Sequence, residues 1–261
     1  MYNYIYNYML LIIIFVIIYL LVRMNIDRMY FEPFNDFGFF NSNYFENFNN
    51  INEKYKFINK NGHYALFKNG KNKKRVMIIA HGNAGSFLDR KLLIDNLDNY
   101  SGDIYAIEYP GFSGLPGTSN IYNCVEEIMF WINLLKPKYK KIDLFGESIG
   151  GGLIIETCIK YSLNCINKIY LQSTFSSLKN VIKDLNYNLY ILYNILLLDD
   201  LNTYENLKKI NCNKFVIIHS LNDRLINYEQ SLSNYELLKK LNKKVKFIEG
   251  EGGHSDTQFK L

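Results

Sequence analysis

The hydrophobic pattern divides most of the chain into short apolar runs separated by longer amphipathic stretches. Eight runs are candidate strands: 55–58, 64–67, 76–80, 104–109, 142–145, 166–171, 215–219 and 245–248. Stretches at 88–97, 121–135 and 228–241 have the length and spacing typical of helices. Continuous apolar runs that alternate with helices indicate right-handed crossovers. The sequence therefore predicts an α/β domain, with a mostly parallel eight-stranded sheet covered by helices on both faces.

Two segments depart from this alternation. The first two runs are joined by residues 59–62, which end in Asn61-Gly62. Asn-Gly is a strong hairpin signal, so the sheet is expected to begin antiparallel. Residues 175–201 are longer than a simple crossover needs and contain helical stretches, so they predict a short helical cap. Within it, Asp199 and Asp200 are interpreted as solvated helix ends.

The N-terminal segment is apolar over a length that suits a membrane. Residues 4–22 carry no charge and as a helix would cross a hydrocarbon core of about 30 Å. A cleaved signal peptide would need a basic start and a small-residue cleavage site, which are absent. We therefore expect residues 1–24 to be a single-pass transmembrane anchor and residues 25–261 to form the catalytic domain. Arg23 and Arg28 favour a cytoplasmic domain, whereas the sequon at 99–101 would fit a luminal one, so the side stays open.

Composition narrows the functional classes. A chain of 261 residues with 48% hydrophobic content suits one large α/β domain. The net charge of +5 comes from scattered lysines, and the local basic run at 71–75 is expected to be a solvated loop. No Walker-type glycine loop accompanies it, so the sequence gives no support for nucleotide or nucleic-acid binding. The cysteines of the chain lack the paired spacing of a metal site, so we expect them to be core thiols: Cys124, Cys158, Cys165 and Cys212. No metal or cofactor is expected.

The pentapeptide Gly146-Glu147-Ser148-Ile149-Gly150 is the most informative local feature. It follows the apolar run 142–145 and leads directly into the helical stretch 151–159. A serine at a sharp strand-to-helix turn is the context of a nucleophile elbow. Such a turn forces Ser148 into a sparsely populated backbone conformation and presses the residues two before and two after it together. Glycine at 146 and 150 would relieve that pressure.

A serine hydroxyl needs a base, and the base needs an acid that orients it. His254 lies in a glycine-bordered loop just after the last apolar run and is the predicted base. His81 and His219 end earlier runs and are weaker candidates, while His63 is expected to have a structural role in the hairpin. Asp223 is the predicted acid. It follows the run 215–219 at the sheet edge where parallel strands place functional loops.

An acyl-transfer site also needs donors for the oxyanion of its tetrahedral intermediate. The backbone N–H of Ile149, at the start of the predicted helix, would supply one donor. The loop 81–86 follows the run 76–80 and reads His-Gly-Asn-Ala-Gly-Ser. By its position in this small, flexible loop, Asn83 is predicted to supply the second donor.

Four motifs together, at 81–84, 108–112, 146–150 and 253–254, resemble the α/β-hydrolase superfamily, as does the chain order of Ser148, Asp223 and His254. More narrowly, the chain resembles the membrane-anchored abhydrolase-domain branch, which contains serine hydrolases of lipid-linked esters, including depalmitoylases and lysophospholipases. The resemblance implies hydrolysis of an ester or thioester on a lipid-like or acylated substrate, with no cofactor.

The chain departs from this family pattern in several places. Ser113 and Leu115 stand where relatives commonly carry glycine and serine, and only seven residues follow His254, where the fold usually adds a helix. Either something else covers that face, or the domain is less stable than its relatives. The cysteine-rich N-terminal segment of the depalmitoylases is also absent.

Two readings of function stay open. The first is the serine hydrolase. Its apolar cap residues suggest an acyl chain as substrate, although such residues more often only seal a cap to its domain: Tyr187, Tyr190, Ile191, Tyr193 and Leu196. The second is a catalytically inactive scaffold of the same fold that acts as a membrane-tethered binding protein. The sequence does not indicate an oligomeric state.

Overall fold

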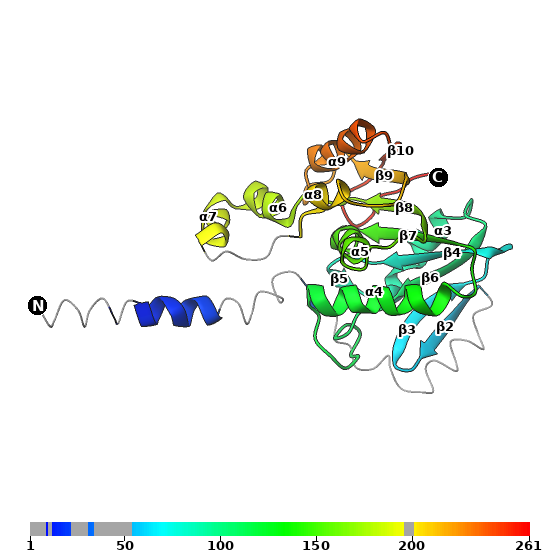
Figure 1. Ribbon diagram of the computed structural model, residues 1–261, viewed down its shortest axis with the longest axis horizontal. Helices are drawn as coiled ribbons and strands as arrows, with labels where there is room; N and C mark the ends of the chain where they lie inside the picture. Colours follow the sequence, from blue (N-terminus) through cyan, green and yellow to red (C-terminus); the bar gives the residue numbers. More distant parts are fainter. Residues whose placement is uncertain (1–8, 10–11, 22–30, 34–53, 196–200) are drawn as a thin grey trace, which may run out of the picture.

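A central sheet of eight strands organises the computed structural model, which describes residues 9, 12–21, 31–33, 54–195 and 201–261 (Figure 1). The strand order is β10-β9-β8-β7-β4-β6-β3-β2. The strands are β2 (Tyr55–Lys60), β3 (His63–Lys68), β4 (Asn72–Ala80), β6 (Gly102–Ile107), β7 (Lys141–Glu147), β8 (Ile166–Gln172), β9 (Lys214–Ser220) and β10 (Lys244–Gly250). All eight predicted runs therefore form strands of one sheet.

The sheet is parallel except around β3, which pairs antiparallel with both β2 and β6. The β2–β3 connection contains Asn61 and Gly62 with φ of 57° and 87°. Both positive values are those of the tight hairpin turn that the Asn-Gly dipeptide predicts. The antiparallel start of the sheet is thereby confirmed.

Helices cover both faces, which explains why the strands are continuously apolar. In β4, Val76, Ile78 and Ala80 pack into one core cluster, whereas Met77 and Ile79 pack into a second cluster on the opposite face. The first cluster is closed by α4 (Ile121–Leu135), α5 (Ile149–Lys160) and α9 (Tyr228–Lys240). The second is closed by the 3-10 helix η2 (Phe87–Arg90) and by α3 (Lys91–Asn96). The predicted helix at 88–97 is thus two short pieces.

Two strand boundaries differ from prediction. The basic run at 71–75 was expected to be a solvated loop, but β4 begins at Asn72. Strand pairing needs only backbone groups, and Asn72 pairs with Gly102 across a register shift. Arg75 also forms an ion pair with Asp143, with Nε and Oδ2 2.5 Å apart. At the other boundary, β6 ends at Ile107, so Glu108 and Tyr109 leave the sheet toward the site.

Residues 175–201 contain two helices, α6 (Leu178–Leu185) and α7 (Tyr187–Ile195), as the predicted cap requires. A further short helix, α8 (Thr203–Leu207), was not predicted because only five residues carry it. Large apolar side chains on the cap remain exposed: Leu185, Tyr187, Ile191, Leu192 and Ile195. Leu196, Asp199 and Asp200 lie outside the described residues.

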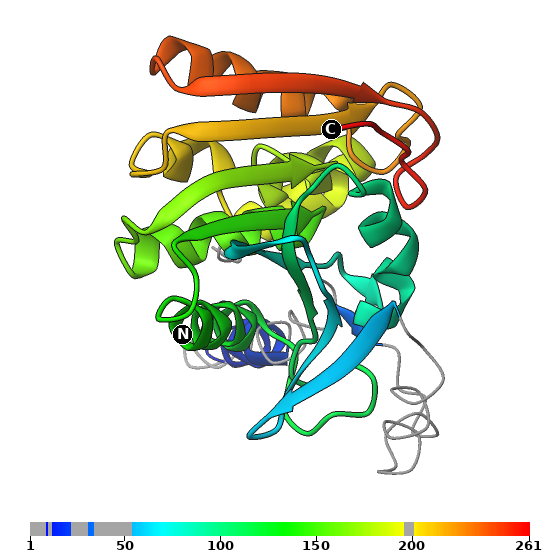
Figure 2. The ribbon, with the colours of Figure 1, turned by 90° about the vertical axis from the view of Figure 1, so that its right-hand side faces the viewer.

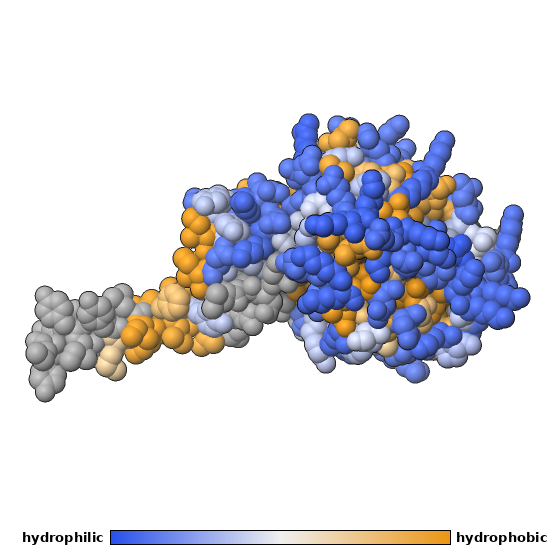
Figure 3. Space-filling model, turned by 45° about the horizontal axis from the view of Figure 1, so that its top comes forward, coloured by the Kyte–Doolittle hydropathy of each residue, from blue (hydrophilic) through white to orange (hydrophobic). Residues whose placement is uncertain are grey.

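The described part of the predicted anchor, residues 12–21, is helical. Its large apolar side chains are mostly exposed, and Figure 3 shows them as an apolar surface that projects from the more polar domain. Among the described residues, no single helix combines the length and the apolar character needed to traverse a bilayer. The ends of the predicted anchor lie outside the described residues.

The chain after His254 folds back along the sheet edge, as Figure 2 shows at the C-terminus. Glu251 and Gln258 form an antiparallel bridge through two backbone hydrogen bonds. The Phe259 ring is buried and lies 6.1 Å from that of Phe145. This short tail, rather than a helix, covers the face that the sequence left open.

Candidate active site

Ser148 stands at the turn between β7 and α5 with φ of 54° and ψ of −121°. This is the sparsely populated conformation that a nucleophile elbow imposes. Its backbone N–H donates to the carbonyl oxygen of Gln172 at 2.8 Å, which ties the turn to β8. A Cβ on Gly146 would lie 2.4 Å from Gly151 Cα, and one on Gly150 would lie 2.2 Å from the carbonyl oxygen of Ala80. The two glycines are therefore required by close backbone packing.

The crowding at Gly150 gives a stability prediction. Gly150→Ala is expected to lower the free energy of unfolding by about 2–4 kcal/mol, because the atoms in the way are backbone and cannot rotate aside. Gly62→Ala is the matched control, since its Cβ would meet nothing within 4 Å and its cost comes only from the positive φ. That cost is about 1–2 kcal/mol. Urea unfolding compares them, and a Gly150→Ala cost no larger than the control's would contradict the packing argument.

The three predicted side chains form one hydrogen-bonded chain. His254 Nε2 lies 3.0 Å from Ser148 Oγ, and His254 Nδ1 lies 2.7 Å from Asp223 Oδ2. Ser148 follows β7, Asp223 follows β9 and His254 follows β10, so all three come from the same edge of the sheet. Ser148 is 7% exposed and Asp223 8% exposed, so both ends of this hydrogen-bonded triad are shielded from solvent.

Asp223 is held in its ionised form by several donors. Its carboxylate accepts from the N–H groups of Leu225 and Ile226 at 2.9 Å, and His219 Nε2 lies 3.1 Å from Oδ2. Burial alone would raise the pKa of this carboxyl, but hydrogen bonds from His219 and His254 and from the backbone hold the pKa well below its usual range. A carboxylate in this state fixes His254 with Nδ1–H toward Asp223 and Nε2 toward the serine.

The lowered pKa of Asp223 makes its stabilising effect depend on pH. The carboxylate stabilises the fold fully above the ordinary aspartate pKa of about 4, and this contribution is lost as the pH falls below it. We expect the difference in free energy of unfolding between wild type and Asp223→Asn to be largest between pH 5 and 7. It should shrink toward pH 2 in urea unfolding at stepped pH. A difference that grows on acidification would contradict this.

The two predicted oxyanion donors flank the serine. Ile149 is the first residue of α5, and Asn83 lies in the loop after β4. Within the described part of the chain, neither backbone N–H has a hydrogen-bond acceptor. The loop is held from outside by a small parallel pair, β1 (Glu32–Pro33) with β5 (Ala84–Gly85), and by Glu32 N–H donating to Asn83 O at 2.8 Å. Both N–H groups are thus available to an oxyanion.

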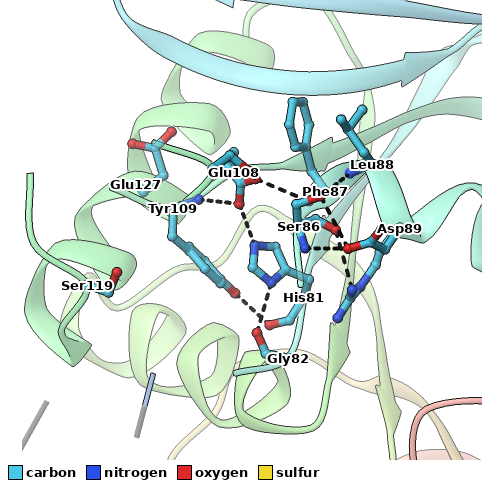
Figure 4. Close-up of polar contacts among 12 residues, drawn as sticks. His81, Gly82, Ser86, Phe87, Leu88, Asp89, Glu108, Tyr109, Ser119 and Glu127 are labelled. Carbon is cyan, nitrogen blue, oxygen red and sulfur yellow. Dashed lines mark hydrogen bonds and ion pairs between the residues drawn. The ribbon is translucent and has the colours of Figure 1, made fainter. Parts of the chain in front are cut away.

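A buried histidine and a buried glutamate hold this loop from inside the protein (Figure 4). Glu108 Oε1 lies 2.7 Å from His81 Nε2, and His81 Nδ1 lies 2.8 Å from Gly82 O. Glu108 also accepts from the Phe87 N–H at 3.3 Å and from the Ser113 hydroxyl. Ser113 has φ of 54°, a value that favours glycine, and its bond to Glu108 offsets part of that strain. His81 is therefore structural in this site.

Arg90 links the oxyanion loop to the elbow. Its Nε lies 2.8 Å from Glu147 Oε2 and its Nη2 lies 3.3 Å from Glu147 Oε1, a bidentate pair. The same guanidinium donates to the carbonyl oxygens of Ala84 and Ser86. Because Glu147 directly precedes Ser148, this arginine sets the spacing between the two halves of the site.

Removing that link should impair positioning. Arg90→Met is expected to lower kcat for an ester by roughly 10- to 100-fold, less than the loss of a whole oxyanion donor, with kcat affected more than KM. Arg90→Lys should recover only part of this, because lysine cannot bond both carboxylate oxygens in the same plane. Lys136→Met, at an exposed position, is the control. Full activity of Arg90→Met would remove this role.

A cavity of about 540 Å³ opens beside Ser148 and His254. It is lined from the oxyanion loop, η2, α3, the ends of β7 and β8, and the loop 254–258. Its lining includes none of the described cap residues at 175–195 and 201. The described apolar side chains of the cap therefore do not line this cavity.

The remaining predicted residues are structural. His63 Nδ1 lies 2.6 Å from Glu127 Oε2, and its ring stacks on Phe130. Cys124, Cys158 and Cys212 are buried, and burial raises the pKa of the Cys158 thiol, so these three are core thiols as predicted. Cys165 is only partly buried and packs at the margin of the core.

Comparison with known sequences gives distant relatives, and no family model matches the chain. An uncharacterized protein of Acanthamoeba polyphaga mimivirus is 28% identical over 199 residues, covering 70% of this chain and 67% of its own length. The uncharacterized protein YfhR of Escherichia coli (strain K12) is 25% identical over 181 residues, covering 67% and 62%. This chain thus matches about two thirds of each relative.

Comparison with solved structures shows the fold. An esterase of Pyrococcus furiosus aligns with a TM-score of 0.60 and 16% identity over 87% of this chain and 90% of its own. A monoacylglycerol lipase of Paleococcus ferrophilus aligns with a TM-score of 0.52 and 18% identity over 74% and 90%. The chain therefore has the α/β-hydrolase fold, with its mostly parallel eight-stranded sheet.

Proposed function

We propose that the protein is a serine hydrolase that cleaves carboxylic esters or thioesters through an acyl-enzyme. The observation that carries this proposal is the hydrogen-bonded chain of Ser148, His254 and Asp223. The esterase and lipase names of the structural neighbours support the reaction class. A scaffold of the same fold would have no chemical need for the three side chains in this order.

The reaction proceeds in two matched halves. Ser148 Oγ attacks the ester carbonyl carbon while its proton passes to His254 Nε2, and the carbonyl oxygen becomes an oxyanion that accepts from Asn83 and Ile149 N–H. The tetrahedral intermediate collapses, the bond to the alcohol or thiol breaks, and His254 protonates the leaving group. Water then attacks the acyl-enzyme, giving its proton to His254, and Ser148 departs with that proton as the acid is released.

A fluorophosphonate probe tests this proposal. It should label wild-type protein at Ser148 and fail to label Ser148→Ala, because the reagent needs an activated serine. Circular dichroism of both proteins checks that they are folded. Folded wild-type protein that does not react with the probe would instead support a binding scaffold.

We also propose that the N-terminal segment holds the protein at a membrane. The exposed apolar side chains along 12–21 support this, since they have no protein core to pack against in the described structure. Flotation with phosphatidylcholine vesicles should recover wild type, but not a variant with Ile13→Lys and Ile17→Lys. Leucine at the same two positions should preserve flotation. Equal flotation of the lysine variant would contradict an anchor in this segment.

A further inference from the structure

The side chain of Gln172 is unusual among the residues that line the cavity. It lies at the end of β8, in register with Glu147 on β7, and only 4% of the residue is exposed. Its Oε1 is buried and has no hydrogen-bond partner among the described residues. The backbone carbonyl of Gln172 already accepts from Ser148 N–H at 2.8 Å, so the elbow does not need the side chain.

A buried amide oxygen without a partner carries an energetic cost, and such atoms are rare in folded proteins. The same condition applies to Thr203 Oγ1 and Asn234 Oδ1, but neither residue lines the cavity. Gln172 therefore differs from them, because this residue lines the cavity beside Ser148. A ligand group that donates a hydrogen bond would remove the cost.

The charges of the cavity indicate which donors fit. Its lining carries three carboxylates, from Asp89, Glu147 and Asp256, and Arg90 is the sole lysine or arginine among the lining residues. The Arg90 guanidinium is already bonded to Glu147 and to two carbonyl oxygens. These carboxylates also have partners, since Glu147 pairs with Arg90, Asp89 accepts from Ser86 N–H and Asp256 accepts from Gly253 N–H. The lining still carries more negative than positive charge, which disfavours an anion and leaves Gln172 Oε1 as an acceptor that is unpaired among the described residues.

We infer that this cavity binds a polar part of the substrate that carries hydroxyl or amine donors, with Gln172 as a specificity-determining residue. This inference rests on the proposed ester hydrolysis and names the substrate class of the same site. A long alkyl chain placed here would cover the Gln172 amide without pairing it, so an acyl chain would have to lie elsewhere, outside this cavity.

Matched esters test the inference on either side of the scissile bond. The acyl pair is p-nitrophenyl butyrate and p-nitrophenyl 3-hydroxybutyrate. The alcohol pair is propyl butyrate and glyceryl 1-monobutyrate, followed by titration of the released acid. In at least one pair, wild type is expected to favour the hydroxylated ester by about tenfold or more in kcat/KM, because a site built for a hydrogen bond rejects the analogue that lacks it.

Variants separate hydrogen bonding from volume. Gln172→Met keeps the volume and removes the acceptor, so the preference should fall to near unity. Gln172→Glu keeps acceptor oxygens in place and should retain the preference. Gln258→Met makes the same change at an exposed position of the lining and should also retain it. Thermal melts of all variants show whether each is folded.

The outcomes are distinct. The inference is overturned by the wild-type data alone if the wild type favours the ester without hydroxyl groups in both pairs. It is also overturned if the wild type prefers the anionic p-nitrophenyl hemisuccinate to p-nitrophenyl butyrate. Retention of the hydroxyl preference in folded Gln172→Met also overturns it. Hydrolysis of none of these esters, together with no fluorophosphonate labelling, would instead defeat the proposed function and this inference with it.

Discussion

Replacing Ser148 with alanine is expected to lower kcat for p-nitrophenyl butyrate by roughly 10⁴- to 10⁶-fold. The attacking oxygen is then absent, and only the oxyanion donors and substrate binding remain to accelerate attack by water. Among the described residues, the Ser148 hydroxyl bonds only to His254, and alanine has no more difficulty than serine with the φ of the elbow. The expected loss is therefore chemical and leaves the fold in place.

A matched control makes this result specific. Ser101→Ala changes an exposed serine far along the sheet from the elbow and should leave kcat unchanged. Both variants should unfold within about 1 kcal/mol of wild type. Ser148→Ala that retains more than a hundredth of the wild-type kcat would mean that another residue performs the attack.

Replacing Asp223 with asparagine is expected to lower kcat by about 10⁴-fold. The asparagine amide can present an N–H to His254 Nδ1, which stabilises the tautomer whose Nε2 carries the hydrogen. That tautomer cannot take a proton from Ser148. Asparagine also cannot stabilise the imidazolium that forms during attack, and it weakens the contact with His219.

Asp98→Asn is the control for Asp223→Asn. Asp98 is exposed and pairs with Lys68 on the surface, so its loss should leave kcat unchanged. The kcat of Asp223→Asn should rise with pH in alkaline buffer, where hydroxide replaces part of the missing base function. A loss below tenfold near neutral pH would show that Asp223 does not orient the base.

The sheet was predictable from the sequence for a physical reason. Buried parallel strands are covered on both faces, so runs such as 76–80 are apolar at every position rather than at alternate ones. The positions of Asp223 and His254 followed from the same topology, because the carboxyl ends of parallel strands meet at one edge. Chain order and spacing therefore indicated which side chains the structure brings to Ser148.

The polar contacts around the site could not be predicted in the same way. Arg90 and Glu147 read as ordinary charged residues of a helix and a turn, and Gln172 lies just beyond the predicted run 166–171. Their roles depend on the packing of η2 over the elbow and on the register of β7 against β8. Glu108 was noticed only within a motif, since its contact with His81 needs β6 to end at Ile107.

The structure of the C-terminal tail could be predicted only in part from the sequence. From the sequence, we expected that something other than the family's usual helix covers this face of the sheet. The sequence did not indicate that a bridge from Glu251 to Gln258 would return Phe259 to the core. The position of the tail depends on the burial of one aromatic side chain, which leaves no periodic hydrophobic pattern in the sequence.

Detection of the acyl-enzyme tests the central claim most directly. Wild-type protein mixed with p-nitrophenyl butyrate and quenched in acid within milliseconds should carry one butyryl group, which peptide mass spectrometry places on Ser148. The burst of p-nitrophenol should match one equivalent of protein. Steady turnover with no butyryl adduct and no burst, or an adduct on a different side chain, would contradict the account.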